Sequence, residues 1–221
     1  MPGPPTSSPI ELEVARIREL SRSGRHGEAL AAAEALAAAV PEHRDVLYLI
    51  AANQRCLNRI PDALATLQRL EQQHPRFSLL YQERGHCYMS LRDATRAIDA
   101  FLRAVKLNPA LATGWIMLER LYRMKGEVEN AATAAEYVST LKHLPPEVVR
   151  AGSLFSDGEL SAAEDILRGY LLNGGNHVEV LRLLGRIEHQ LNALDEAELL
   201  LEAALKLVPI IGLHVWITSA Y

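Results

Sequence analysis

The side chains of this chain that could do covalent or metal chemistry are its histidines, cysteines and carboxylates. The eight histidines are scattered, and Cys56 and Cys87 lie too far apart for a C-x-x-C site. The sequence contains no H-E-x-x-H, no G-x-S-x-G and no glycine-rich phosphate loop. The acidic residues Glu127, Glu129 and Glu136 are most simply a solvated helix face. We therefore expect no catalytic residue, no metal site and no cofactor.

Composition favours packed helices and disfavours one class of partner. Hydrophobic residues make up 49% of the chain, much of this alanine and leucine, whereas aromatic residues make up 5%. This balance favours closely packed helices over sheets. The formal net charge of -4 argues against a nucleic-acid binder, because such proteins usually need a basic surface.

The first nine residues, 1–9, are rich in proline, serine and glycine. They lack a basic stretch followed by an apolar one, so they do not resemble a secretory signal, and we expect a flexible lead-in. No window of the chain reaches the roughly 18 apolar residues of a membrane span. These features predict a cytoplasmic protein without membrane contact.

The stretch 78–110 is typical of two amphipathic helices that pack against each other, with a turn near Arg92. Tyr81 and Gly85 lie at helical spacing on the first helix, and Phe101 lies on the second. A glycine at a helix crossing lets the two backbones approach closely, and a neighbouring aromatic side chain fills the remaining gap. One such pair cannot bury its own apolar face, so it needs copies of itself on either side.

The copies are present at a period of 34 residues. Prolines at Pro41, Pro75 and Pro109 share one phase, and alanines at Ala29, Ala63, Ala97 and Ala131 share another. A helix–turn–helix unit with this period is typical of tetratricopeptide repeats. The chain resembles that family over residues 10–221, and the residues that match its pattern best are Trp115, Leu118, Tyr122, Gly126 and Ala131.

The resemblance implies an all-α fold, a right-handed superhelical solenoid of antiparallel helix pairs that forms one domain over residues 10–221. Six repeats are expected, at 10–43, 44–77, 78–111, 112–143, 144–177 and 178–211, with a partial seventh at 212–221. Glu119 replaces the usual small residue of repeat four, and Arg59 stands where a turn glycine is common. In repeat five the phase slips, because Gly158 and Ala163 follow their counterparts by 32 residues.

The family resemblance also assigns a concave groove to one side of each first helix. The residues that it places there as a peptide-binding surface are Arg18, Arg22, Tyr48, Arg55, Gln82, His86, Met89, Ile116, Arg120, Arg123, Arg182, Arg186 and His189. Among all the inward positions, arginine is the main charged residue. Arginine forms planar, bidentate pairs with carboxylates and phosphates.

We therefore expect a non-catalytic protein-interaction scaffold whose groove holds a peptide with acidic side chains, a C-terminal carboxylate or a phosphate. The alternative is that these arginines pair with neighbouring glutamates and form an ordinary solvated surface. The lysine and asparagine pattern of the family's carboxylate clamp is absent, so a co-chaperone role is not expected.

Two further functions stay open from the sequence. The alanine-rich units loosely resemble the N-terminal repeat regions of bacterial sulfotransferase and glycosyltransferase proteins, which would make this chain a docking domain for a catalytic domain beyond residue 221. The apolar half-unit at 212–221 could instead serve as a surface for self-association.

Repeat five is predicted to be an irregular joint. Pro145 and Pro146 interrupt the helix before it, and Gly152 weakens its first helix by about 1 kcal/mol relative to alanine. Backbone amides of 147–155 should therefore exchange with solvent faster than those of 112–124, as measured by native-state hydrogen exchange. Equal protection of the two helices would rule out a joint of this kind.

Overall fold

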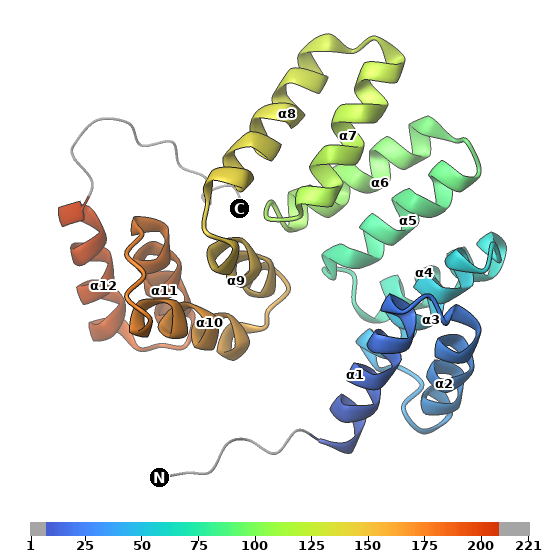
Figure 1. The fold of residues 1–221 in the computed structure, drawn as a ribbon, viewed down its shortest axis with the longest axis horizontal. Coiled ribbons are helices and arrows are strands. Elements are labelled where there is room, and N and C mark those ends of the chain that lie inside the picture. Colours follow the sequence, from blue (N-terminus) through green and yellow to red (C-terminus); the bar gives the residue numbers. More distant parts are fainter. Residues whose placement is uncertain (1–7, 208–221) are drawn as a thin grey trace. The chain divides into compact units, whose positions relative to one another are not determined.

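In the computed structural model, residues 8–207 are described, and they form twelve α-helices and no β-strand. The helices are α1 Pro9–Arg22, α2 His26–Ala39, α3 Arg44–Cys56, α4 Ile60–Gln73, α5 Ser78–Ser90, α6 Ala94–Leu107, α7 Ala112–Lys125, α8 Val128–His143, α9 Pro146–Ser156, α10 Leu160–Leu172, α11 Val178–Gln190 and α12 Leu194–Leu207. Consecutive helices form antiparallel pairs (Figure 1). This confirms the predicted all-α repeat fold, with one helix pair in each of the six expected repeats. The predicted partial repeat at 212–221 lies outside the described residues.

Helix α1 begins slightly earlier than predicted because its first turn is capped. The side chain of Ser8 accepts a hydrogen bond from the Glu11 backbone N–H, and the Glu11 carboxylate accepts one from the Ser8 N–H at 2.7 Å. Pro9 opens the helix, where its missing N–H costs nothing. Of the segment predicted to be flexible, Ser8 is therefore the cap of α1 and Pro9 is its first residue.

Each first helix is followed, one or two residues after its end, by a residue with left-handed backbone. The positions are Gly24, Asn58, Arg92, Gly126, Gly158 and Asn192, with φ between 59° and 84°. In repeat two the turn position is therefore Asn58, and the assignment of Arg59 to it was wrong by one residue. Asparagine adopts this backbone more readily than other non-glycine residues, which explains how repeat two turns without a glycine.

The close helix crossing predicted for repeat three is present. A Cβ added to Gly85 would lie 2.7 Å from Cζ of Phe101, whose side chain is fully buried. Repeat six uses the same arrangement, since a Cβ on Gly185 would lie 2.8 Å from Cγ of Leu201. Repeat two has the fully buried Ala51 at the equivalent position. A small residue on the first helix thus makes room for a large one on the second.

The chain divides into two compact units, residues 1–101 and 102–221, and the division falls inside α6. One core cluster of the first unit joins α1, α2 and α3 through residues such as Ile17, Ala33 and Val46. In the second unit a cluster around Phe155, Leu167 and Leu184 joins α9, α10 and α11. Each unit therefore contains more than one repeat in a shared core. The prediction of a single domain remains a prediction.

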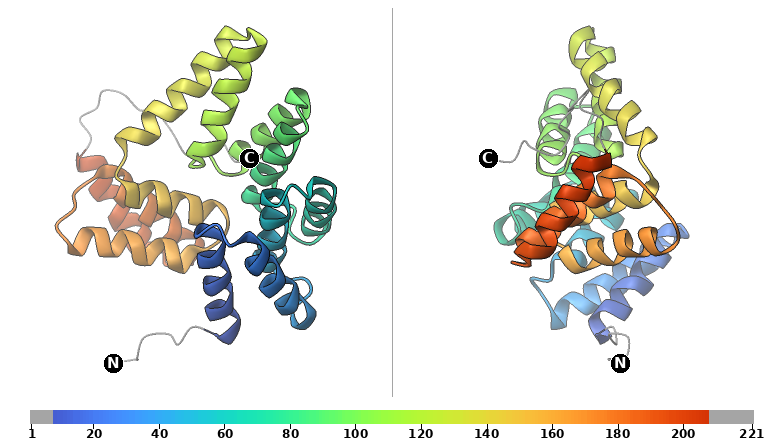
Figure 2. Two further views of the ribbon diagram at one scale, coloured as in Figure 1. Left: turned by 45° about the vertical axis from the view of Figure 1, so that its right-hand side comes forward. Right: turned by 90° about the vertical axis from the view of Figure 1, so that its left-hand side faces the viewer.

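The first helix of repeat five is shorter than the other first helices. Helix α9 has 11 residues, whereas the other first helices have 13 or 14. It begins at Pro146, directly after the extended residue Pro145, so α8 cannot continue into it. Figure 2 shows α8 ending and α9 setting off in a new direction. The register slip read from the sequence therefore corresponds to a change of direction between the 16-residue helix α8 and the short helix α9.

Substituting Gly85 with alanine tests how tight the crossing in repeat three is. The new methyl group would overlap the Phe101 ring, and overpacking of a filled core typically costs about 1–3 kcal/mol. Urea unfolding should show a loss of that size. Gly27→Ala is the matched control: no atom lies within 4 Å of the new methyl, so helix propensity should leave stability unchanged or raised by up to about 1 kcal/mol. Equal stability of the two variants would show that the crossing has spare room.

Candidate functional site

In the first unit, all three predicted groove arginines form ion pairs, two of them between successive first helices. Arg18 of α1 donates to Asp45 of α3 at 2.9 Å, and Arg55 of α3 donates to Glu83 of α5. Glu83 is buried, with 4% of its surface exposed, and Arg55 is its ion-pair partner. Arg22 lies within 3.6 Å of Glu19 on its own helix, and both side chains are well exposed. The predicted groove arginines of this unit therefore form ion pairs with acidic side chains of the same chain.

The uncharged groove residues of the first unit are half-buried. The ring of Tyr48 meets Phe77 edge-on, with centroids 5.7 Å apart, and burial raises the pKa of its hydroxyl. The His86 ring meets Phe101 edge-on at 5.1 Å, and burial lowers the pKa of its imidazole. Met89 is also half-buried. These side chains give the first-helix face an apolar character between the ion pairs.

Gln82 is the one uncharged groove residue of the first unit that has a buried side-chain atom without a hydrogen-bond partner among the described residues. Its Oε1 is buried and accepts no hydrogen bond from the described residues. A buried acceptor without a donor typically costs about 1–3 kcal/mol.

In the second unit, α7 carries the most exposed part of the predicted groove. Ile116 and Met124 are 41% and 72% exposed, and Arg120 lies between them at helical spacing and is also exposed. Arg123 pairs with Glu119 at 2.7 Å, so the residue that departs from the family pattern gives this arginine a partner. Among residues 8–207, Arg120 has no acidic partner.

Helix α11 carries the remaining predicted groove residues. Arg182 pairs with Glu179 at 2.6 Å, and the guanidinium of Arg186 lies 4.6 Å from the centroid of the Phe155 ring. Burial lowers the pKa of Arg186, and its buried Nη1 has no hydrogen-bond partner among the described residues. His189 is exposed at the end of the helix.

Most of the predicted groove cations are thus neutralised inside the chain. Five of the seven arginines pair with an acid, namely Arg18, Arg22, Arg55, Arg123 and Arg182. Only Arg120 and Arg186 lack an acidic partner among residues 8–207. The alternative interpretation, that the arginines pair with neighbouring acids, therefore holds for most of the set. The groove residues themselves remain a prediction.

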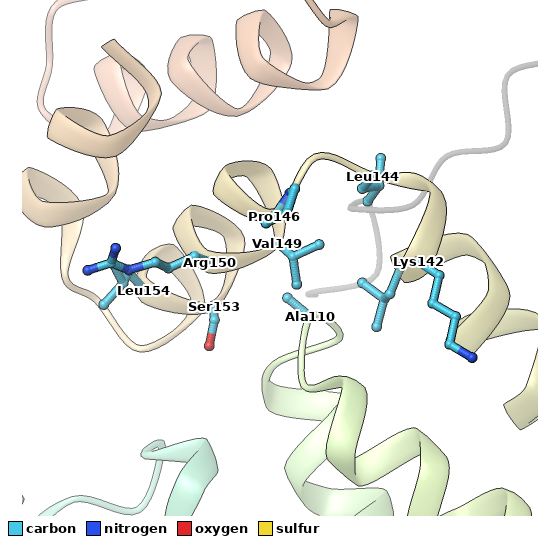
Figure 3. A pocket seen from close by; sticks show the side chains of 9 residues that line it. Ala110, Lys142, Leu144, Pro146, Val149, Arg150, Ser153 and Leu154 are labelled. Atoms are coloured by element: carbon cyan, nitrogen blue, oxygen red, sulfur yellow. The ribbon is translucent and has the colours of Figure 1, made fainter. Parts of the chain in front are cut away.

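The sequence did not predict a hollow at the start of repeat five. We call it the junction hollow, and it has a volume of about 530 Å³ (Figure 3). It is lined by Ala110, Leu141, Lys142, Leu144, Pro146, Val149, Arg150, Ser153 and Leu154. An adjoining hollow of about 390 Å³ shares Ala110, Leu141, Leu144 and Val149 and extends to Phe155 and Leu183. The 32-residue spacing and the Pro145–Pro146 pair were the signal that this place is irregular.

Neither a metal site nor a membrane-spanning helix is found in the part of the chain that the structure describes. Between residues 8 and 207, no group of three or more histidine, cysteine or acidic side chains is placed to hold a metal ion. Cys56 is exposed and Cys87 is buried, and both are free thiols. Within the same range, no helix combines the length and apolar character needed to cross a membrane.

The repeat pattern, the helix pairs and the crossings agree with one family. The sequence model of the tetratricopeptide repeat matches residues 14–76, 54–112 and 149–209, which together cover most of the chain. This chain belongs to the tetratricopeptide repeat family. No match is found among curated proteins.

Solved structures share the fold of this tetratricopeptide repeat protein. PilF of Pseudomonas aeruginosa aligns with a TM-score of 0.56 and 15% identity, covering 90% of this chain and 92% of PilF. MamA from Desulfovibrio magneticus aligns at 0.51 with 14% identity, covering 91% and 96%. The Cut9–Hcn1 hetero-tetramer of the APC/C aligns at 0.53 with 17% identity, covering 89% of this chain and 39% of the matched chain. At such low identity these matches show the fold alone, and none of them is described as a transferase.

The Arg55–Glu83 pair allows a test of how much a predicted groove arginine contributes to the stability of the fold. Arg55→Met should lower the free energy of unfolding by about 3–5 kcal/mol, because it leaves the buried Glu83 carboxylate without a partner. Arg22→Met is the control, since its exposed pair at 3.6 Å should contribute less than about 1 kcal/mol. Urea unfolding of both variants gives the comparison. If Glu83→Leu does not restore stability to Arg55→Met, the loss has another cause.

Proposed function

We propose that this chain is a non-catalytic scaffold that binds a partner protein or peptide along its first helices. The observation that carries the proposal is the exposed stripe of Ile116, Arg120 and Met124 on α7. These residues are four apart, so they lie on one face of the helix. Apolar side chains around an unpaired arginine are typical of recognition surfaces, where aromatic residues, methionine and arginine are enriched.

The chemistry of the stripe favours a partner that supplies negative charge. Arg120 has no acid of this chain within reach among residues 8–207, whereas most other groove arginines do. A carboxylate or phosphate on the partner would form the charge-assisted pair that the chain itself does not provide. The partner is therefore a peptide with an acidic side chain, a C-terminal carboxylate or a phosphate, and with apolar residues that cover Ile116 and Met124.

Family membership supports the general form of this proposal. Tetratricopeptide repeats mediate protein–protein interactions, and Cut9–Hcn1 is a complex of two different proteins. The docking of this chain to a sulfotransferase or glycosyltransferase domain has no supporting relative among those described above. Self-association through residues 212–221 concerns a segment outside the described part of the chain.

Arg120→Glu tests the proposal without disturbing an internal ion pair. An array of peptides with acidic, phosphorylated and neutral sequences would identify ligands, and fluorescence anisotropy would give their affinities. We expect acidic or phosphorylated ligands to lose about tenfold or more in affinity for Arg120→Glu, because attraction becomes repulsion. Lys106→Glu on α6 makes the same change of charge at an exposed site and should leave affinity unchanged. Equal affinities of wild type and Arg120→Glu would contradict the proposal.

A further inference from the structure

The junction hollow exists because repeat five begins irregularly. Pro145 is extended and Pro146 opens α9, so the chain turns sharply after α8 and the first helix that follows is short. In a regular repeat, a longer first helix would pack along its neighbours. Here the end of α8, the start of α9 and the loop before α7 border an open depression, and the adjoining hollow is more enclosed.

The floor of the hollow is apolar and is held in place by a buried polar contact. Leu141, Leu144, Val149 and Ala110 line both the junction hollow and the adjoining one. Asn108 is fully buried; its amide donates to Ser153 Oγ at 2.9 Å, and its Oδ1 accepts from the Ala110 N–H at 3.1 Å. This contact fixes the loop before α7 against α9. A surface that is already ordered loses little entropy when a ligand binds.

The size of the space suits a large apolar side chain. The two hollows have volumes of about 530 and 390 Å³, within the range of roughly 300–1,000 Å³ that is common for ligand pockets. For comparison, an apolar cavity of about 150 Å³ is enough to hold a benzene molecule. One phenylalanine, tryptophan or leucine side chain can therefore enter, with room for the neighbouring backbone at the opening.

The rim of the hollow is positively charged. Lys142 and Arg150 are its only ionisable lining residues among those described, and both are exposed. Figure 3 shows their side chains extending in opposite directions from the apolar floor. Neither side chain pairs with an acid in residues 8–207, although Glu147 is nearby in the sequence. The adjoining hollow contains two acids: Glu179, whose carboxylate pairs with Arg182, and the exposed Glu136 on α8.

From the apolar floor between two unpaired cations, we propose that the junction hollow is a docking site for a peptide of a partner protein. The peptide buries one bulky apolar side chain between α8 and α9 and carries acidic residues on both sides of it. These residues pair with Lys142 and Arg150, and the two cations fix the line along which the peptide crosses the hollow. This site is separate from the α7 stripe and does not depend on the proposal made for it.

The test uses the full chain and three synthetic peptides. The first has one tryptophan flanked by glutamates, the second replaces the tryptophan with alanine, and the third replaces the glutamates with lysines. Anisotropy should show binding of the first peptide and at least about tenfold weaker binding of the other two. The double variant Lys142→Glu, Arg150→Glu should also weaken binding of the first peptide at least about tenfold.

Two controls separate this site from the alternatives. Arg69→Glu with Lys106→Glu makes the same change of charge at exposed positions elsewhere and should leave affinity unchanged, as should Arg120→Glu. Undiminished binding by the Lys142, Arg150 double variant overturns the proposal, and so does equal binding of the lysine peptide. Binding that appears only after Trp216→Ser, in the C-terminal segment of the same chain, would show that this segment occupies the hollow. Binding that weakens as chain concentration rises would show that a second copy does.

Discussion

No helix pair in this chain can bury its own apolar face, and the fold depends on this constraint. An amphipathic pair leaves one side of its core uncovered, so each repeat is stable only against another repeat. The two helices of a pair must therefore approach each other closely, so that both outer faces of the pair can pack against the neighbouring repeats. Gly85 against Phe101 and Gly185 against Leu201 achieve this, because a first-helix residue without a side chain accepts a large one from the second helix.

The charged residues of the first helices follow from the same constraint. When first helices of neighbouring repeats pack side by side, residues about 27 or 28 apart in the sequence meet at their shared edge. Arg18 with Asp45 and Arg55 with Glu83 are such meetings. A buried carboxylate such as Glu83 is tolerated only with its partner. These arginines therefore stabilise the packing of neighbouring repeats. Arg120 has no acidic partner among residues 8–207, and for this reason the proposed partner is placed against it.

Repeat five shows the consequence of an irregular helix pair in the stack of repeats. A shortened α9 and the adjacent prolines remove contacts that a regular repeat would make, and Asn108 supplies a specific polar contact in their place. The space that remains is apolar because it is made of residues that would otherwise be core. An irregularity in a repeat array can in this way leave an apolar hollow without any dedicated loop or insertion.

The sequence alone determined the helix pairs, their 34-residue period, the turn near Arg92 and the close crossing at Gly85. These features are local or periodic, so they can be read from the residues that recur every 34 positions. Only the tertiary structure decided which arginines are neutralised, because Arg55 and Glu83 are 28 residues apart and meet only after two helices have packed. It also decided that the slip at Pro145–Pro146 leaves a hollow, since a change of phase gives the place of an irregularity but not the volume that the surrounding side chains leave empty.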